Sequence, residues 1–206
     1  MPKKSRLPRM EPVRPKVRDI TRTPFVDIRE WTFELKYDGY RGVLHIEERP
    51  HTVSKQMKPL PRFDALSEAI KAELKVENAV LDGEVVVFDT GGRPHLKNLM
   101  RHLGKPVYVA FDLLWLNGED LRELPLIERR KRLKKIVPKK SKAILLPVHV
   151  DGRGDTLFKE VCRLDLEGMI AKRLLDPYRT LSTRWYKILN PLYTSKVVKK
   201  KRKSGV

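Results

Sequence analysis

Apolar residues fall into short runs separated by loops rich in proline and glycine. Continuous or partly alternating runs of this kind, enriched in β-branched and aromatic residues, are typical of strands. They predict strands over residues 31–38, 41–48, 79–88, 107–116, 143–150, 167–173 and 184–189. Because Asp38-Gly39 is a turn signal, we expect the first two strands to be joined there as a hairpin.

Helical spacing of apolar residues occurs between these runs. Phe63, Leu66, Ile70 and Leu74 lie 3, 4 and 4 residues apart, which predicts an amphipathic helix over 63–75. Further helices are expected near 96–103, over 154–164, and in the basic stretch whose apolar stripe is Leu126, Leu133, Ile136 and Val137. Residues 50–62 contain three prolines and are expected to form a loop. This mixed order favours an α+β fold of antiparallel sheets flanked by helices.

The two ends of the chain differ in composition from its middle. Residues 1–24 are basic and rich in proline, so we expect an extended or disordered arm, with the fold starting near Phe25. The folded domain would span residues 25–192, and residues 193–206 would form a basic tail. With 206 residues, of which 40% are apolar, the chain is long enough for a proper core.

Composition also limits the compartment. The only cysteine is Cys162, which excludes an intrachain disulfide and favours a reducing environment. Neither a run of eighteen apolar residues nor a secretory signal is present in the sequence. We therefore expect a soluble, cytoplasmic protein without membrane contact.

The net charge of +19 is concentrated in three stretches, residues 1–20, 128–142 and 196–206. The middle one holds nine Lys/Arg and one Glu. Such patches bind polyanions, and nucleic acid is the commonest partner, although a solvated helix face and solubilising tails are the alternative. The candidate nucleic-acid contacts are Lys55, Arg129, Arg130, Arg132, Lys200, Lys201 and Arg202.

Lys36 is the main candidate for chemistry. A free lysine is almost wholly protonated at neutral pH, so a nucleophilic role requires desolvation, a neighbouring cation or a metal ion. Taken alone, Lys36 could equally be a solvated strand residue.

The apolar run over 79–88 is interrupted by Asp82 and Glu84, and buried acids are costly unless paired or metal-bound. Carboxylates, an aromatic ring and several cations would together suit the binding of a nucleoside triphosphate. The sequence contains neither of the glycine-rich phosphate-binding motifs GxxxxGK[ST] and GxGxxG, so lysines and a metal ion would have to bind the phosphates.

Five motifs stand in order along residues 25–190, and together they are specific although each alone is weak. They are Glu34-Leu35-Lys36-Tyr37-Asp38-Gly39-Tyr40-Arg41, Leu81-Asp82-Gly83-Glu84, Ala110-Phe111-Asp112-Leu113-Leu114, Glu167-Gly168-Met169-Ile170-Ala171-Lys172 and Trp185-Tyr186-Lys187. This set resembles the nucleotidyltransferase domain of ATP-dependent DNA ligases, and especially the ligase domain of bacterial and archaeal end-joining systems.

The resemblance implies an ATP-grasp-like covalent nucleotidyltransferase fold and a role for each matching residue. Lys36 would attack the α-phosphorus of ATP, keep AMP as a phosphoramidate, and pass it to a DNA 5′-phosphate before the nick is sealed. Glu34 would read the adenine edge, Phe111 would stack on the base, and Arg41 and Glu84 would hold ribose. Leu35 would belong to the same nucleotide-binding site. Glu84 and Glu167 would hold Mg²⁺ or Mn²⁺, and Lys172 and Lys187 would contact the α-phosphate. Singly, Phe111 could be a core residue and the charged residues could be solvated.

The resemblance also implies partners and a setting. They are nicked or broken double-stranded DNA and end-joining repair proteins, for a monomer associated with the nucleoid of a bacterium or archaeon. A capping-type guanylyltransferase or an RNA ligase shares the lysine motif. A non-catalytic adenylate- or nucleic-acid-binding module of the same fold is the alternative from another class.

Three departures from the family pattern stand out. Ser54-Lys55-Gln56 replaces a segment that usually carries an arginine, and lysine cannot reproduce a bidentate contact. Leu189 stands where a second lysine is usual after Lys187. The OB-fold domain that closes over DNA in the family is expected to be absent, so either a natural minimal protein or an excised adenylation domain fits.

Overall fold

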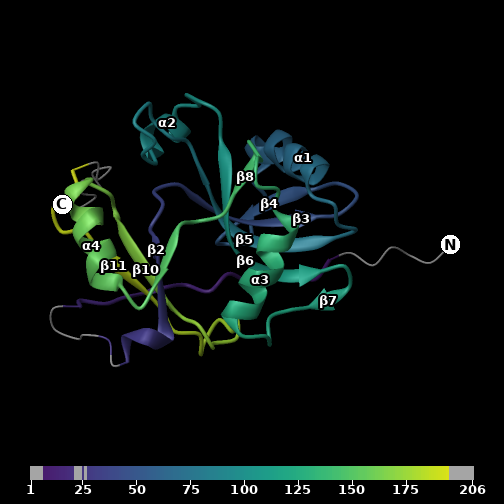
Figure 1. Cartoon of the computed structure of the whole chain (residues 1–206). Helices are drawn as coiled ribbons and strands as arrows, with labels where there is room; N and C mark the ends of the chain where they lie inside the picture. Colours follow the sequence, from purple (N-terminus) through teal and green to yellow (C-terminus); the bar gives the residue numbers. More distant parts are fainter. Residues whose placement is uncertain (1–6, 21–24, 26, 195–206) are drawn as a thin grey trace, which may run out of the picture.

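The computed structural model describes residues 7–20, 25 and 27–194, and its two β-sheets form two lobes (Figure 1). The larger sheet has the order β4-β3-β5-β6-β7, with β8 pairing with β6, and the smaller has the order β1-β11-β10-β2-β9. All strand pairs are antiparallel except β1 with β11 and β6 with β8. The predicted α+β fold on antiparallel sheets is confirmed.

The element bounds follow the sequence pattern closely in most places. The strands are β1 Lys16–Val17, β2 Trp31–Leu35, β3 Tyr40–Ile46, β4 His51–Ser54, β5 Ala79–Val86, β6 Val107–Leu116, β7 Glu119–Asp120, β8 Ile144–Leu145, β9 His149–Asp151, β10 Gly168–Arg173 and β11 Trp185–Leu189. The helices are α1 Asp64–Glu73, α2 Leu96–Met100, α3 Leu126–Ile136 and α4 Gly154–Arg163, with 3₁₀ turns at Ile28–Glu30 and Pro61–Phe63. No helix of the described residues has the length and apolarity that a membrane crossing needs.

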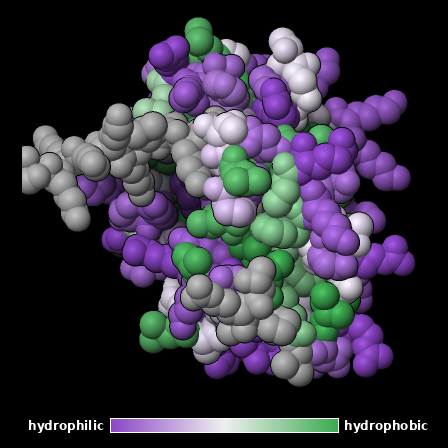
Figure 2. Space-filling view, turned by 90° about the vertical axis from the view of Figure 1, so that its left-hand side faces the viewer, coloured by the Kyte–Doolittle hydropathy of each residue, from purple (hydrophilic) through white to green (hydrophobic). Residues whose placement is uncertain are grey.

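Each sheet has its own apolar core. In the larger lobe, Ile70 of α1 and Leu133 of α3 belong to the same buried cluster as residues of β3, β5 and β6. In the smaller lobe, α4 packs its Val161 against Phe33 of β2. Figure 2 looks onto this side of the molecule, where apolar side chains form a band bordered by hydrophilic ones. A third cluster, which includes Val43 and Trp185, joins strands of the two sheets.

The expected hairpin at Asp38-Gly39 is wrong. β2 belongs to the smaller sheet and β3 to the larger one, so the chain crosses from one lobe to the other at this point. A Cβ on Gly39 would lie 2.2 Å from the carbonyl oxygen of Val85, which explains why the crossing takes a residue without a side chain. The turn signal therefore marks a change of sheet.

Two further local predictions need correction. The expected loop over 50–62 contains β4, which pairs with β3 at the edge of the larger sheet. The expected strand over 143–150 is divided into β8, which pairs with β6 in the larger sheet, and β9, which pairs with β2 in the smaller one. Pro147 lies between them and lacks the N–H that a continuous ladder would need.

The fold begins well before Phe25. Met10 and Val13 are only 1% and 2% exposed and belong to the cluster that joins the sheets. Lys16–Val17 then pairs in parallel with β11. Part of the expected arm is therefore built into the domain and crosses from the larger lobe to the smaller one (Figure 1).

Candidate active site

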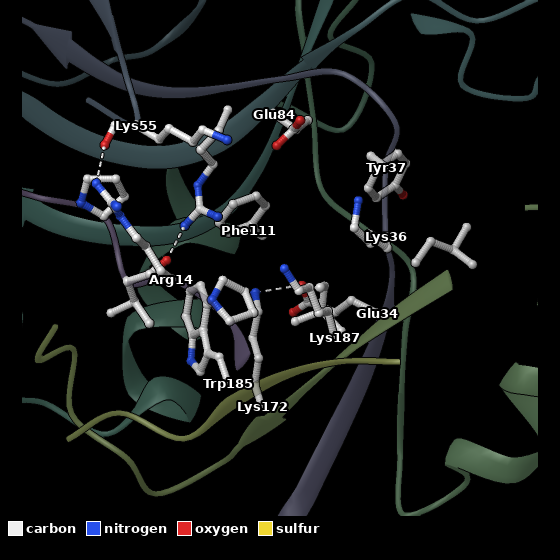
Figure 3. A pocket seen from close by; sticks show the side chains of 16 residues that line it. Arg14, Glu34, Lys36, Tyr37, Lys55, Glu84, Phe111, Lys172, Trp185 and Lys187 are labelled. Carbon is white, nitrogen blue, oxygen red and sulfur yellow. Dashed lines mark hydrogen bonds and ion pairs between the residues drawn. The ribbon is translucent and has the colours of Figure 1, made fainter. Parts of the chain in front are cut away.

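A cavity of about 330 Å³ opens between the two sheets (Figure 3). Eight of the nine residues predicted to bind the nucleotide line it, namely Glu34, Leu35, Lys36, Arg41, Glu84, Phe111, Lys172 and Lys187. The ninth, Glu167, lines an adjoining hollow that shares Lys36 with the cavity. Residues that are up to 153 positions apart in the sequence are thus brought together by the sheets.

The smaller sheet supplies one wall through the register of three strands. Ile170 of β10 lies opposite both Glu34 of β2 and Lys187 of β11. Lys36 follows directly on β2, and its backbone N–H donates to the carbonyl of Gly168 at 2.9 Å. This bond holds Lys36 beside the first residue of β10, next to Glu167.

The larger sheet supplies the opposite wall. Arg41 of β3 and Glu84 of β5 are direct cross-strand neighbours, and Phe111 comes from β6. Lys55 directly follows β4. The unpredicted strand β4 is therefore what brings Lys55 to the cavity.

Lys36 forms an ion pair with Glu167, and the two side chains are 24% and 23% exposed. Burial raises the pKa of Glu167, and Lys36 opposes this rise. Burial also raises the pKa of Glu84 to about 7, with Arg41 and Lys36 acting against it and Glu167 adding to it. Glu84 and Glu167 thus both lie close enough to Lys36 for its charge to oppose the rise in their pKa.

Glu34 and Lys172 form a second, buried ion pair at 2.6 Å. Burial lowers the pKa of Lys172, and Glu34 limits the decrease. The Lys172 Nζ also lies 4.3 Å from the ring centroids of both Phe111 and Trp185. The other carboxylate oxygen of Glu34, Oε1, is buried and has no hydrogen-bond partner among the described residues, so it is a vacant acceptor on a residue that lines the cavity.

Arg41 is held by Asp82, which the sequence marked as an acid without an explanation. The guanidinium donates to both Asp82 oxygens at 2.6 and 2.5 Å, and Tyr178 Oη donates to the same carboxylate at 2.5 Å. Burial works to lower the pKa of Arg41, but Asp82 outweighs it and the pKa is raised. The Arg41 Cζ lies 4.6 Å from the centroid of Phe111.

Comparison with known proteins identifies the domain. Residues 17–188 match the sequence profile of the ATP-dependent DNA ligase domain. The chain belongs to this family.

Two curated relatives illustrate how much of a ligase the chain represents. It is 36% identical over 170 residues to the multifunctional non-homologous end joining protein LigD of Pseudomonas aeruginosa, which covers 77% of this chain and 20% of that protein. It is 31% identical over 179 residues to the DNA ligase of Thermococcus onnurineus, covering 77% of the chain and 32% of the ligase. The chain thus spans a third or less of these relatives.

Solved structures agree with the family assignment. The mycobacterial DNA ligase D complexed with ATP and MES superposes with a TM-score of 0.63 at 29% identity, over 77% of this chain and 54% of that one. The ligase domain of LigD from M. tuberculosis gives the same TM-score at 28% identity, over 76% and 54% of the two chains. The expected nucleotidyltransferase fold is confirmed.

The carboxylates of this ligase domain suit a magnesium ion in their chemistry. Mg²⁺ prefers oxygen ligands and is commonly held by one or two carboxylates together with substrate phosphates. Glu84 and Glu167 supply such oxygens near Lys36. Within the described ranges there is no cluster of three or more His, Cys, Asp or Glu that could hold a metal without a substrate.

The residues predicted to bind nucleic acid separate into different environments. Arg129 is wrong as a contact, because it is fully buried and donates to both oxygens of Asp112 at 2.7 Å. Arg130 donates to Thr32 Oγ1, and Arg132 pairs with Glu119 at 2.5 Å. Lys200, Lys201 and Arg202 lie outside the described residues. Within the basic stretch 128–142, the exposed lysines without an ion pair in the described chain are Lys134, Lys135, Lys139, Lys140 and Lys142.

Several residues that line the cavity had no predicted role. Trp185 stands in the last motif and contributes its ring, and Tyr37 follows the lysine, with its pKa raised to about 12 by burial and by Glu34. Arg14 comes from the expected arm. The only sequence signal that could have placed Arg14 near the core is the apolar pair Met10 and Val13 among basic neighbours.

Proposed function

We propose that this ligase domain transfers AMP from ATP to Lys36 and then to a DNA 5′-phosphate. The observation that carries the proposal is the convergence of Lys36 with carboxylates, cations and an aromatic ring on one cavity between the sheets. Its volume lies at the small end of the range for ligand pockets, as an AMP-sized group needs. The family assignment supports the same chemistry.

The first step is a displacement at phosphorus. The unprotonated Nζ of Lys36 forms a bond to the α-phosphorus, the bond from that phosphorus to the bridging oxygen breaks, and pyrophosphate leaves with the electron pair. Lys187 lines the cavity together with Lys36 and would stabilise the negative charge that develops on the phosphoryl oxygens. In the second step an oxygen of the strand's 5′-phosphate displaces Lys36 from the same phosphorus.

Recognition of the base is supported by the vacant acceptor on Glu34. An exocyclic amino group of adenine could donate to Oε1, while the Lys172 ammonium holds the other oxygen in place. Phe111 would stack on the base. Arg41 is engaged by Asp82 on its Nε and one terminal nitrogen, so Glu84 would carry more of the ribose contact than the sequence suggested.

Glu84 and Glu167 would hold Mg²⁺ or Mn²⁺. When bound, the ion would supply positive charge that polarises the α-phosphate and favours the neutral form of the Lys36 amine.

Intact-mass spectrometry tests the first step. On incubation with ATP and Mg²⁺ the wild type should gain about 329 Da, the mass of one AMP moiety expected for lysine adenylylation, and Lys36→Ala should gain nothing. Lys97→Ala removes a charge from α2, away from the cavity, and should keep the adduct. An unmodified wild type would favour the non-catalytic module, and an adduct formed with GTP in place of ATP would favour a capping-type enzyme.

The acceptor and the partners are proposed from the same family assignment. Nicked or broken double-stranded DNA is the proposed acceptor, and proteins of an end-joining complex are the proposed partners of a cytoplasmic monomer. Comparing AMP transfer to nicked DNA and to nicked RNA of the same sequence separates a DNA ligase from an RNA ligase. Preference for nicked RNA would overturn the choice of acceptor.

A further inference from the structure

The N-terminal strap, which we define as residues 10–17, forms part of the cavity wall. All but its last residue precede the stretch that matches the family profile. The Val13 N–H donates to Tyr178 Oη at 2.9 Å, and the Arg41 guanidinium donates to the Val13 carbonyl at 3.3 Å. With the parallel pairing of Lys16–Val17 to β11, these bonds attach the strap to both lobes. The strap is thus part of the site.

Arg14 is fixed at the cavity by its neighbours in the strap. Val13 is buried in the core, and Pro15 restricts Arg14 to an extended backbone. The guanidinium of Arg14 donates to the backbone carbonyl of Lys55 at 3.3 Å, and both residues line the cavity. The Arg14 guanidinium and the Lys55 backbone, from segments 41 residues apart, therefore meet on the cavity wall, and both side chains line it.

The charges of Arg14 and Lys55 are not neutralised within the described chain, where neither side chain has a carboxylate within ion-pair distance. By contrast, Lys36, Arg41 and Lys172 each face a carboxylate. Two exposed cations on a cavity wall suit a phosphate group, which a guanidinium can bind through two parallel hydrogen bonds. Lysine alone gives no such bidentate contact.

We propose that Arg14 and Lys55 form a phosphate-binding site in which the strap supplies the guanidinium. Figure 3 shows both residues on one side of Phe111 and Lys36 on the other. We therefore assign them a phosphate other than the one that Lys36 attacks. It belongs either to the rest of the ATP polyphosphate or to the nucleic-acid strand that receives AMP. The identity of these two ligands rests on the proposed function, but the anion site does not need the reaction to occur.

The test uses two matched ligand pairs and measures equilibrium binding without metal, so that no adduct is required. One arm compares ATP with adenosine, and the other compares nicked duplexes that differ only in a 5′-phosphate or a 5′-hydroxyl at the nick. In each arm the ratio of the two affinities reports recognition of phosphate. Arg14→Gln should reduce this ratio roughly tenfold in one arm, the size expected for a lost charge-assisted hydrogen bond.

The arm that responds identifies the source of the phosphate. Lys55→Gln should lower the ratio in the same arm, while Arg101→Gln, an equal charge change at an exposed site away from the cavity, should leave both arms unchanged. The proposal would be overturned if Arg14→Gln gave the same affinity ratios as Arg101→Gln. It would also be overturned if Arg14→Gln and Lys55→Gln lowered the ratio in different arms. Failure of the wild type to form an adduct would instead overturn the proposed function.

Discussion

Two ion pairs of this domain show opposite uses of charge. Arg129 of α3 and Asp112 of β6 are both 0% exposed, and Arg129 also donates to the carbonyls of Leu124 and Asp176. Lys36 and Glu167 pair at the cavity, where about a quarter of each side chain remains exposed. The closed pair has its hydrogen bonds satisfied inside the protein and fastens a helix to a sheet. The open pair keeps atoms available for a ligand.

Breaking the closed pair should have the largest effect on stability. Arg129→Ala leaves the Asp112 carboxylate buried without its cation, which typically costs about 3–5 kcal/mol. Urea unfolding should show this loss, whereas Lys131→Ala on the exposed side of the same helix should change the free energy of unfolding by less than about 0.5 kcal/mol. A stable Arg129→Ala with weakened DNA binding would contradict the structural role and restore the sequence-based expectation.

The open site should respond to pH instead. Glu84 has a pKa of about 7 in the folded protein and an ordinary value of 4.5, so the folded state binds its proton more tightly. The free energy of unfolding should therefore fall as pH rises from about 4.5 through 7, by up to about 3 kcal/mol.

Glu84→Gln removes this titration and provides the control. Urea unfolding without metal or nucleotide, at several pH values from 5 to 8, should give a decline in the wild type that the variant lacks. If the free energy of unfolding changed with pH equally in the two proteins, Glu84 would titrate near its ordinary pKa. The charge of the Glu84 carboxylate would then be compensated by its neighbours as fully as that of Asp112 is by Arg129.

The sequence could predict most strands and the family, because both depend on patterns within short segments of the chain. Spacing and composition identified the strands that carry Glu84 and Phe111 and the strand that ends just before Lys36, because each lies in an apolar run rich in β-branched and aromatic residues. The joint occurrence of five motifs then predicted the family, which the profile match confirmed. The family prediction did not depend on knowing which sheet each strand joins. It is therefore correct even though the hairpin predicted at Asp38-Gly39 is wrong.

What the sequence could not predict depends on long-range pairing. Arg129 lies three residues after Leu126 and four before Leu133, so helical spacing puts it on the buried stripe of its helix, whereas Lys134 lies off that stripe. The sequence alone does not show which carboxylate compensates Arg129, because that depends on the position of Asp112 on β6. The polar strand β4 and the short strand β1 have little periodicity and form because a partner strand is present. Arg14 was missed for the same reason, since its place at the cavity follows from β1 and Val13.

Tyr178 lies next to both the closed pair and the cavity wall, because the Cζ atom of Arg129 is 5.6 Å from the centroid of its ring, and its hydroxyl group contacts Val13 of that wall. Its Oη donates to Asp82, which holds Arg41, and accepts the N–H of Val13 from the strap. Tyr178→Phe leaves a buried N–H without its acceptor and removes one hydrogen bond from Asp82, but Arg41 still compensates the carboxylate. The expected loss is therefore only about 1–2 kcal/mol. Tyr40→Phe, whose hydroxyl has no hydrogen bond in the described chain, should cost less than about 0.5 kcal/mol. Tyr178→Phe could instead prove as destabilising as Arg129→Ala. The Asp82 carboxylate would then depend on the Tyr178 hydroxyl as much as Asp112 depends on Arg129, and Asp82 would have a mainly structural role.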